Sequence, residues 1–170
     1  MRSAVVSAVI LLLVLVHIQD SLSNSVRTMC LQKYSPRPCG GGWIRVTGNK
    51  CVKYFRLSKT FWEAQSHCAG QGGHLASIHN TDENGHVMCL SVSTPKKSPT
   101  SNDYFWIGGR SSAPLSGYGW TDKSAFGFTK WHPGQPVNRA SHTCVAMNYK
   151  HWGDWTNIDC NSKKNFVCVR

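Results

Sequence analysis

The chain has 170 residues, of which 41% are hydrophobic, 19 are Lys or Arg, 8 are Asp or Glu and 8 are Cys. This length and apolar content predict a single folded domain and exclude a disordered chain, and eight cysteines favour an oxidising compartment. A formal net charge of +11 with so few carboxylates weighs against a calcium cage of acidic side chains and against a paired-carboxylate active site.

The first 23 residues are typical of a cleaved signal peptide. Arg2 carries a positive charge, residues 4–16 form an apolar run of 13 residues, and small side chains at Ser21 and Ser23 suit a cleavage site. The apolar run is shorter than the roughly 20 residues that a membrane-spanning helix needs. We therefore predict a secreted, extracellular protein without a transmembrane segment.

The mature chain is predicted to begin with a short N-terminal extension, residues 24–38. The extension is polar, and Pro36 and Pro38 oppose any regular element within it. The remaining residues, 39–170, have the denser pattern of apolar, aromatic and cysteine residues that a folded domain requires.

A hairpin and a capped helix open this domain. Residues 43–46 and 51–55 have strand character on either side of a turn, which predicts an antiparallel pair. Thr60 and Glu63 form a capping box, in which each side chain satisfies a free amide at the helix start. The helix is expected to run to about Cys68, and the apolar spacing predicts that its buried face holds Phe61, Ala64 and Cys68.

A short strand and a second helix follow. Residues 75–78 are the predicted strand, and Asn80 with Glu83 forms a second capping box that opens a helix through Leu90. The Pro/Ser-rich basic stretch 94–103 has no apolar residue to bury and is predicted to be a loop.

The last third of the chain alternates between buried strands and one long loop. Residues 105–109 are an apolar run that ends in glycines, as expected for a buried strand. Residues 110–142 have little periodicity, and irregular segments of this length in a compact domain are usually functional. Residues 144–147 and 166–169 are predicted to be closing strands.

The motifs, in this order, resemble the C-type lectin-like domain, with some resemblance to fish C-type lectins. The resemblance is carried by Cys39 and Trp43, the 62–68 helix, Gly73-His74-Leu75-Ala76-Ser77-Ile78, Trp106-Ile107-Gly108, Trp131 with Gly134-Gln135-Pro136, Cys144-Val145, Gly153 and Trp155 before Cys160, and Phe166-Val167-Cys168. It implies an α+β fold in which two helices flank antiparallel sheets, with a long irregular loop region that carries the binding surface.

The resemblance also implies most of the disulfide pairing. The implied bridges are Cys39–Cys51, Cys68–Cys168 and Cys144–Cys160, which leave Cys30 and Cys89 unassigned. Three possibilities remain open for these two residues: a bridge to each other, a link between two chains of a homodimer, or free thiols.

The positions that hold calcium in sugar-binding members of the family have lost their carboxylates here. They read Gln135-Pro136-Val137, His142 and Trp155-Thr156-Asn157. Calcium requires six to eight oxygen ligands, and imidazole suits it poorly. We therefore expect no metal or other cofactor at this site. Asp154 and Asp159 flank these positions and are the two acids that could compensate for the lost ligands. We favour the interpretation of Asp154 as a loop cap and Asp159 as a surface turn residue.

Positive charge and aromatic side chains are the remaining binding features. Residues 110–170 contain eight basic residues against three acids, a balance that attracts sulfated glycans and other polyanions. Four tryptophans, Trp43, Trp62, Trp106 and Trp155, lie at core positions of the family, whereas Trp120, Trp131 and Trp152 lie in the long loop. The candidate ligand-binding residues are Arg110, Lys130, Gln135, Asn138, Arg139, His142, Lys150, Trp152 and Asn157.

These features favour a binding module in innate defence rather than an enzyme. Our first hypothesis is a secreted protein that recognises glycans or anionic microbial or extracellular surfaces, without calcium and without specific nucleic-acid binding. A second hypothesis is a conventional lectin that binds carbohydrate through the degenerate Gln-Pro-Val site. A third follows from the resemblance of residues 77–80, 89–93 and 106–110 to the eosinophil major basic protein subgroup, which disrupts membranes or binds heparan sulfate. Ice or mineral binding is the least favoured.

Overall fold

The computed structural model describes residues 2–92, 98–113 and 116–170, without the side chains of residues 2–6 and 17–25. Its helices are α1 (Arg2–Lys33), α2 (Phe61–Gly70), α3 (Thr81–Cys89) and the 3-10 turn η1 (Ser101–Asp103). Its strands are β1 (Arg37–Gly40), β2 (Trp43–Thr47), β3 (Lys50–Lys59), β4 (His74–Leu75), β5 (Phe105–Arg110), β6 (Gly119–Trp120), β7 (His142–Met147), β8 (Trp155–Asp159) and β9 (Lys164–Val169).

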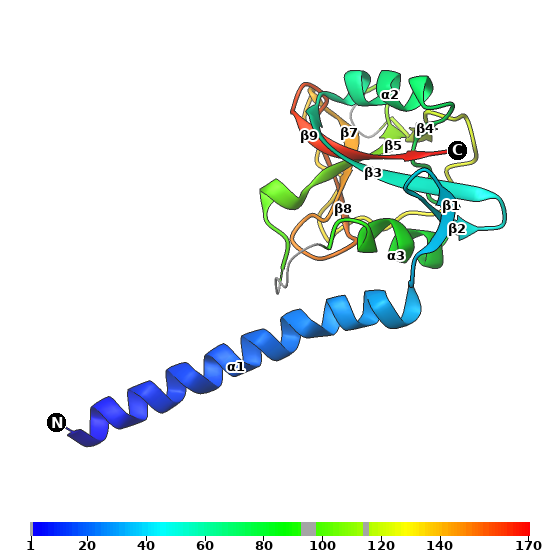
Figure 1. The fold of residues 1–170 in the computed structure, drawn as a ribbon. Coiled ribbons are helices and arrows are strands. Elements are labelled where there is room, and N and C mark those ends of the chain that lie inside the picture. Colours follow the sequence, from blue (N-terminus) through cyan, green and yellow to red (C-terminus); the bar gives the residue numbers. More distant parts are fainter. Residues whose placement is uncertain (1, 93–97, 114–115) are drawn as a thin grey trace.

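One sheet joins the strands, and helices cover it on opposite sides. The strand order is β1-β2-β3-β9-β5-β7-β8, with β4 added to β9 and β6 to β5, and only the β5–β9 pair is parallel. Helix α2 lies on one side of the strands and α3 on the other (Figure 1). The core has two clusters. The cluster at α2 contains Phe61, Trp106 and Phe166. The cluster at α3 contains Val87 and Trp155. The predicted α+β fold is confirmed.

The first capping box forms as predicted. The Thr60 hydroxyl accepts a hydrogen bond from the Glu63 amide at 3.4 Å, and the Glu63 carboxylate accepts one from the Thr60 amide at 2.8 Å. Three side chains of the helix are buried, Phe61, Ala64 and Cys68, as the apolar spacing predicts. The capping box and the apolar spacing, both read from neighbouring residues, were therefore sufficient to predict α2.

The second capping box forms only in part. The Asn80 carboxamide caps the Glu83 amide at 2.9 Å, but the Glu83 carboxylate accepts instead from Lys50 Nζ at 2.7 Å and from the His79 amide at 3.0 Å. Glu83 is only 5% exposed, and a buried carboxylate requires a cation and donors. Burial alone would raise the pKa of Glu83, but its hydrogen bond with Lys50, the Lys50 charge and the His79 amide hold that pKa below its usual range.

The N-terminal extension is more regular than its prolines suggest, so the prediction of an irregular segment is wrong. Helix α1 continues to Lys33, and β1 pairs with β2 at the edge of the sheet. An edge strand tolerates Pro38, because the missing amide N–H has no neighbouring strand to bond. Cys30 and Tyr34 are buried against the domain, and Val26 and Met29 also pack on its core. The N-terminal part of α1 projects away from the domain (Figure 1). Within the described residues, no helix is both long enough and apolar enough to cross a membrane.

Four disulfides include the three that the resemblance implies, Cys39–Cys51, Cys68–Cys168 and Cys144–Cys160. The fourth joins Cys30 of α1 to Cys89 at the end of α3. All eight cysteines are therefore paired within the chain, and no thiol remains for the interchain bridge considered above. The hypothesis of a disulfide-linked homodimer through Cys30 or Cys89 is wrong.

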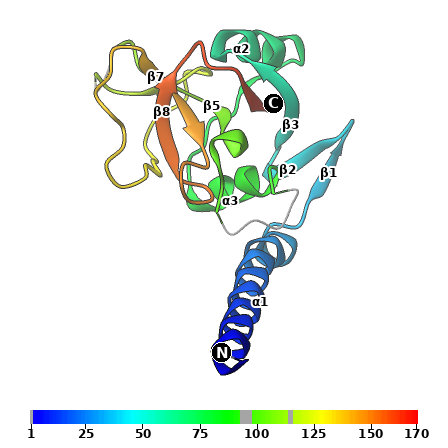
Figure 2. The same ribbon diagram turned by 90° about the vertical axis from the view of Figure 1, so that its left-hand side faces the viewer.

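Two strand predictions change in extent. Of the strand expected over 75–78, only Leu75 is in a strand, β4 (His74–Leu75), while β8 joins the sheet without having been predicted. Where the segment between β5 and β7 is described, it is irregular apart from β6, as expected, and it lies to one side of the domain beside β7 and β8 (Figure 2). Of the loop predicted over 94–103, residues 94–97 lie outside the described residues.

Candidate functional site

A small hollow of about 190 Å3 lies where the long loop meets β7 and β8. Four of the predicted ligand-binding residues converge on it. The lining residues are Gln135, Val137, Arg139, His142, Tyr149, Thr156, Asn157 and Ile158. This volume is below the 300–1,000 Å3 typical of pockets for drug-sized ligands, so the hollow suits a single small group at the surface.

The Asn157 side chain ties the loop to the sheet. It is 1% exposed, its carboxamide oxygen accepts from the Val137 amide at 2.7 Å, and its NH2 group donates to the carbonyls of Val137 at 2.8 Å and His142 at 2.6 Å. Both donors and the acceptor of the amide are therefore used by backbone groups. We call this arrangement of Asn157, Val137 and His142 the amide clamp.

A second internal bond joins the neighbouring ligand positions. The Thr156 hydroxyl donates to the Gln135 carboxamide oxygen at 2.8 Å, and the peptide bond between Gln135 and Pro136 is cis. Among the described residues, no carboxylate lines the hollow, and both side-chain amide oxygens already accept a hydrogen bond. This donor set does not fit a calcium ion, which needs several oxygens and gains affinity from anionic ones.

The other predicted ligand-binding residues lie around the hollow or away from it. Asn138 is exposed in the same segment, and Lys150 is exposed with its ammonium 5.3 Å from the ring of Tyr149, which lines the hollow. Trp152 is half-buried and packs against the core, so it is not an exposed stacking surface. Arg110 belongs to a different surface, described below.

Asp154 is not the loop cap that we expected. It is 7% exposed, and its carboxylate lies 3.0 Å from His132 Nδ1, 3.3 Å from Lys130 Nζ and 3.5 Å from His151 Nδ1. Lys130 is therefore paired with an acid rather than free to meet an anionic ligand. Asp159 is not the surface turn residue that we expected: it is the half-buried last residue of β8, and its carboxylate accepts from the Asn161 amide of the following turn at 2.9 Å.

Comparison with known proteins decides the family. The family model of the Lectin C-type domain matches residues 57–170. This chain belongs to the C-type lectin domain family. It is 36% identical over 133 residues to C-type isolectin Sp-CL4 of Scorpaena plumieri, covering 77% of this chain and 88% of that protein.

Two further relatives show the range of this C-type lectin family. The alpha-N-acetylgalactosamine-specific lectin of Patiria pectinifera is 37% identical over 134 residues, covering 74% of this chain and 76% of that protein. The solved structure of a calcium-independent type II antifreeze protein matches with a TM-score of 0.66 and 25% identity, covering 78% of this chain and 94% of that chain. The present chain is therefore a lectin-like binding domain.

Trp62 is the exposed tryptophan of this lectin domain, although its family position suggested a core role. Trp62 is 52% exposed, whereas Trp120, expected in the open loop, is 5% exposed. Trp131, also in the long loop, is partly buried and packs on the core residue Trp155 with ring centroids 5.9 Å apart. Helical periodicity could have identified Trp62, because it does not share the helix face of Phe61 and Ala64.

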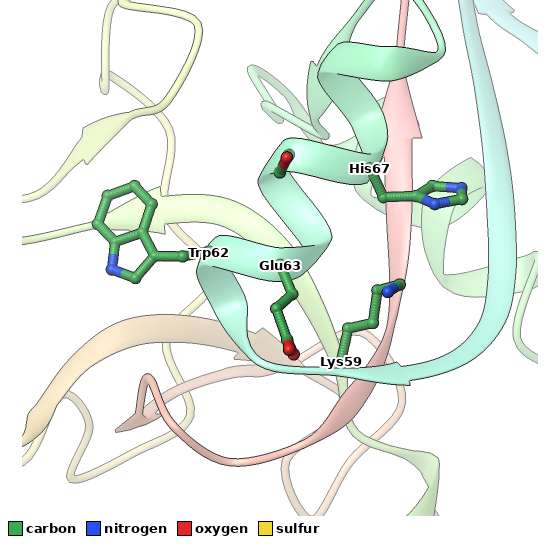
Figure 3. Close-up of a pocket in the computed structure, with 5 residues that line it drawn as sticks. Lys59, Trp62, Glu63 and His67 are labelled. Carbon is green, nitrogen blue, oxygen red and sulfur yellow. The ribbon is translucent and has the colours of Figure 1, made fainter.

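Two shallow hollows flank Trp62. One, of about 520 Å3, is lined by Lys59, Trp62, Glu63, Ser66 and His67 along α2 (Figure 3). The other, of about 270 Å3, is lined by Trp62, Gln65, Arg110, Gly119, Trp120 and Thr121, and the Arg110 guanidinium stacks 4.8 Å from the Trp62 ring. Arg110 therefore contributes to this second surface and not to the hollow at the amide clamp.

Proposed function

We propose that this chain is a secreted C-type lectin of innate defence that binds anionic glycans, such as sulfated polysaccharides, on microbial or extracellular surfaces without calcium. The amide clamp is the observation that carries the proposal. In it, Asn157 joins Val137 to His142 by three hydrogen bonds, so the loop keeps its shape without an ion to organise it. A hollow without a carboxylate does not repel an anionic group.

Two cations support the choice of an anionic ligand. Arg139 is exposed where it lines the hollow, and Lys150 is exposed beside it on Tyr149. Lys130 adds little, because Asp154 pairs with its ammonium. A guanidinium presents two parallel donors that match the oxygens of a sulfate or carboxylate, so we assign the larger share of recognition to Arg139.

The test is binding to immobilised heparin and to a neutral galactose polymer across a salt series, with calcium and with chelator. We expect heparin binding that is insensitive to chelator and weakens steeply with salt, because each neutralised charge releases condensed counterions. Reversing Arg139 and Lys150 to Glu should remove two contacts and flatten the slope of log K against log salt by about 1.4, at about 0.7 per contact as for nucleic acid single strands.

The matched control reverses Arg27 and Arg56, which are also exposed but lie in α1 and β3. It changes the net charge by the same amount, so equal losses in both double variants would mean that only net charge matters. Binding of the neutral polymer that a chelator abolishes would refute calcium independence. Loss of heparin binding in Trp62→Ala, with Arg139→Glu unaffected, would move the site to the surface around Trp62 and Arg110.

A further inference from the structure

His132, His151 and Asp154 form a cluster next to the amide-clamp hollow that the proposed glycan function does not use. Their ligand atoms, one from each residue, all lie within 4.8 Å of one another. His132 and Asp154 are buried, with side chains 11% and 10% exposed, whereas the His151 side chain is 70% exposed. Two ligands are therefore fixed inside the domain and the third faces solvent.

We propose that this cluster is a binding site for a divalent transition-metal ion, with Zn2+ the natural candidate. Zinc binds imidazole nitrogen and carboxylate oxygen at about 2.0–2.2 Å in tetrahedral geometry, which places ligand atoms about 3.3 Å apart. Here Asp154 Oδ2 lies 3.0 Å from His132 Nδ1 and 3.5 Å from His151 Nδ1, on either side of that spacing. All three ligand atoms lie within 4.8 Å of one another, so the site must contract on binding, and the exposed His151 side chain is the ligand that can move.

The chemistry of the donors separates this site from a calcium site. Two imidazoles and one carboxylate suit zinc, copper or nickel, whereas calcium and magnesium prefer oxygen ligands alone. Binding must break the hydrogen bond between His132 Nδ1 and Asp154 Oδ2, because a ligating nitrogen must offer a free lone pair. Metal ligands must be deprotonated, so zinc binding to this protein should weaken as the pH falls.

The backbone holds the three ligands in place before any metal binds. The His132 amide donates to the Trp155 carbonyl at 3.0 Å, next to Asp154 in the chain. The Asp154 amide donates to the His151 carbonyl at 3.2 Å, which closes the turn that carries both residues. The buried Asn148 carboxamide caps the same turn by accepting from the Gly153 amide at 3.0 Å. Preorganised ligands lower the conformational cost of binding.

Lys130 is the group that opposes the metal. Its ammonium lies 3.3 Å from Asp154 Oδ1, which leaves Oδ2 available to the ion but keeps a positive charge close to the site. The single carboxylate is already paired with the Lys130 ammonium, so the site offers little negative charge to balance the two positive charges of the ion. We therefore expect micromolar rather than picomolar affinity for Zn2+.

The test is calorimetric titration of the full chain, made without a histidine tag and freed of metal by chelator, with ZnCl2 and separately with CaCl2. We expect one zinc bound per chain, with a zinc-dependent rise in melting temperature and no comparable heat from calcium. His151→Gln removes the exposed ligand without disturbing the core. It should weaken zinc binding by at least the roughly 10–100-fold that loss of an outer-shell partner costs.

His79→Gln is the matched control, because His79 is also exposed but lies outside the cluster. It should leave zinc affinity unchanged. The proposal is refuted if wild type and His151→Gln bind zinc equally, or if His79→Gln loses as much affinity as His151→Gln. Neither result depends on whether the protein binds glycans, because no sugar is present in the titration.

Discussion

Replacing Asn157 by Asp exchanges the NH2 group of the amide clamp for an oxygen, and the structure predicts a large loss of stability. The NH2 group of Asn157 becomes a carboxylate oxygen that faces the carbonyl oxygens of Val137 at 2.8 Å and His142 at 2.6 Å. Two donated hydrogen bonds are lost, and two carbonyls lose their donor beside a new buried charge. Lost bonds of this kind contribute about 1 kcal/mol each, and an unpaired buried charge adds to that.

We therefore expect Asn157→Asp to lower the free energy of unfolding by about 3 kcal/mol at neutral pH. At roughly 2–4 °C per kcal/mol for a chain of this size, the melting temperature should fall by about 6–12 °C. Burial and the facing carbonyls should raise the pKa of the new carboxyl above about 3.9, its unfolded value. The deficit should then be largest above that raised pKa and shrink as the pH falls, because the protonated carboxyl regains one donor.

Calorimetric melting at pH 7.5 and pH 5, each with chelator and with millimolar calcium, measures all of these effects. Asn138→Asp is the control, since it makes the same exchange at an exposed position of the same segment. If Asn157→Asp melts within about 1 °C of wild type at pH 7.5, the amide clamp does not hold the loop. If wild type itself gains stability from calcium, the conclusion that its donor set does not fit the ion is wrong.

Two further predictions concern the docking of α1 and the buried ion pair. Gly85→Ala should destabilise the protein by about 1–3 kcal/mol, because the added Cβ would clash with the Tyr34 ring. In thermal melting, the double variant Gly85→Ala with Tyr34→Ala should recover much of the lost stability. Glu83→Gln should cost about 1–3 kcal/mol at pH 7. Because the pKa of Glu83 is depressed in the folded state, its contribution to stability is present above the ordinary carboxyl pKa and is lost as the pH falls. The variant should therefore melt closer to wild type in acid. A stability difference that persists in acid would contradict the Lys50 pairing.

The sequence was most informative where partners lie close together along the chain. Thr60 and Glu63 are three residues apart, and their capping box was predicted in full because both halves of it are local. Glu83 follows the same local rule, yet its carboxylate turned to Lys50, 33 residues away, because the fold buries it. A local motif thus predicts the helix start but not the partner of a side chain that the tertiary structure removes from solvent.

The candidate site shows the same limit. The absence of carboxylates at the family's calcium positions could be read from Val137, His142 and Asn157, but the hydrogen bonds of the amide clamp depend on how the loop folds back onto β8. The pairing of Asp154 with His132 joins residues 22 apart across irregular backbone, which no periodicity signals. Resemblance assigned Trp62 to the core, although its place on the helix already argued for exposure.

The Cys30–Cys89 bridge has a consequence that concerns proteolysis. Its span of the chain overlaps the span closed by Cys68–Cys168, so the two together cover every peptide bond between Cys30 and Cys168. A single cut anywhere in that interval leaves both pieces covalently joined. Without Cys30–Cys89, a cut in β3 after Cys51 would release the N-terminal hairpin. The fourth bridge thus lets the protein keep all its parts after a nick, which suits a molecule that meets proteases.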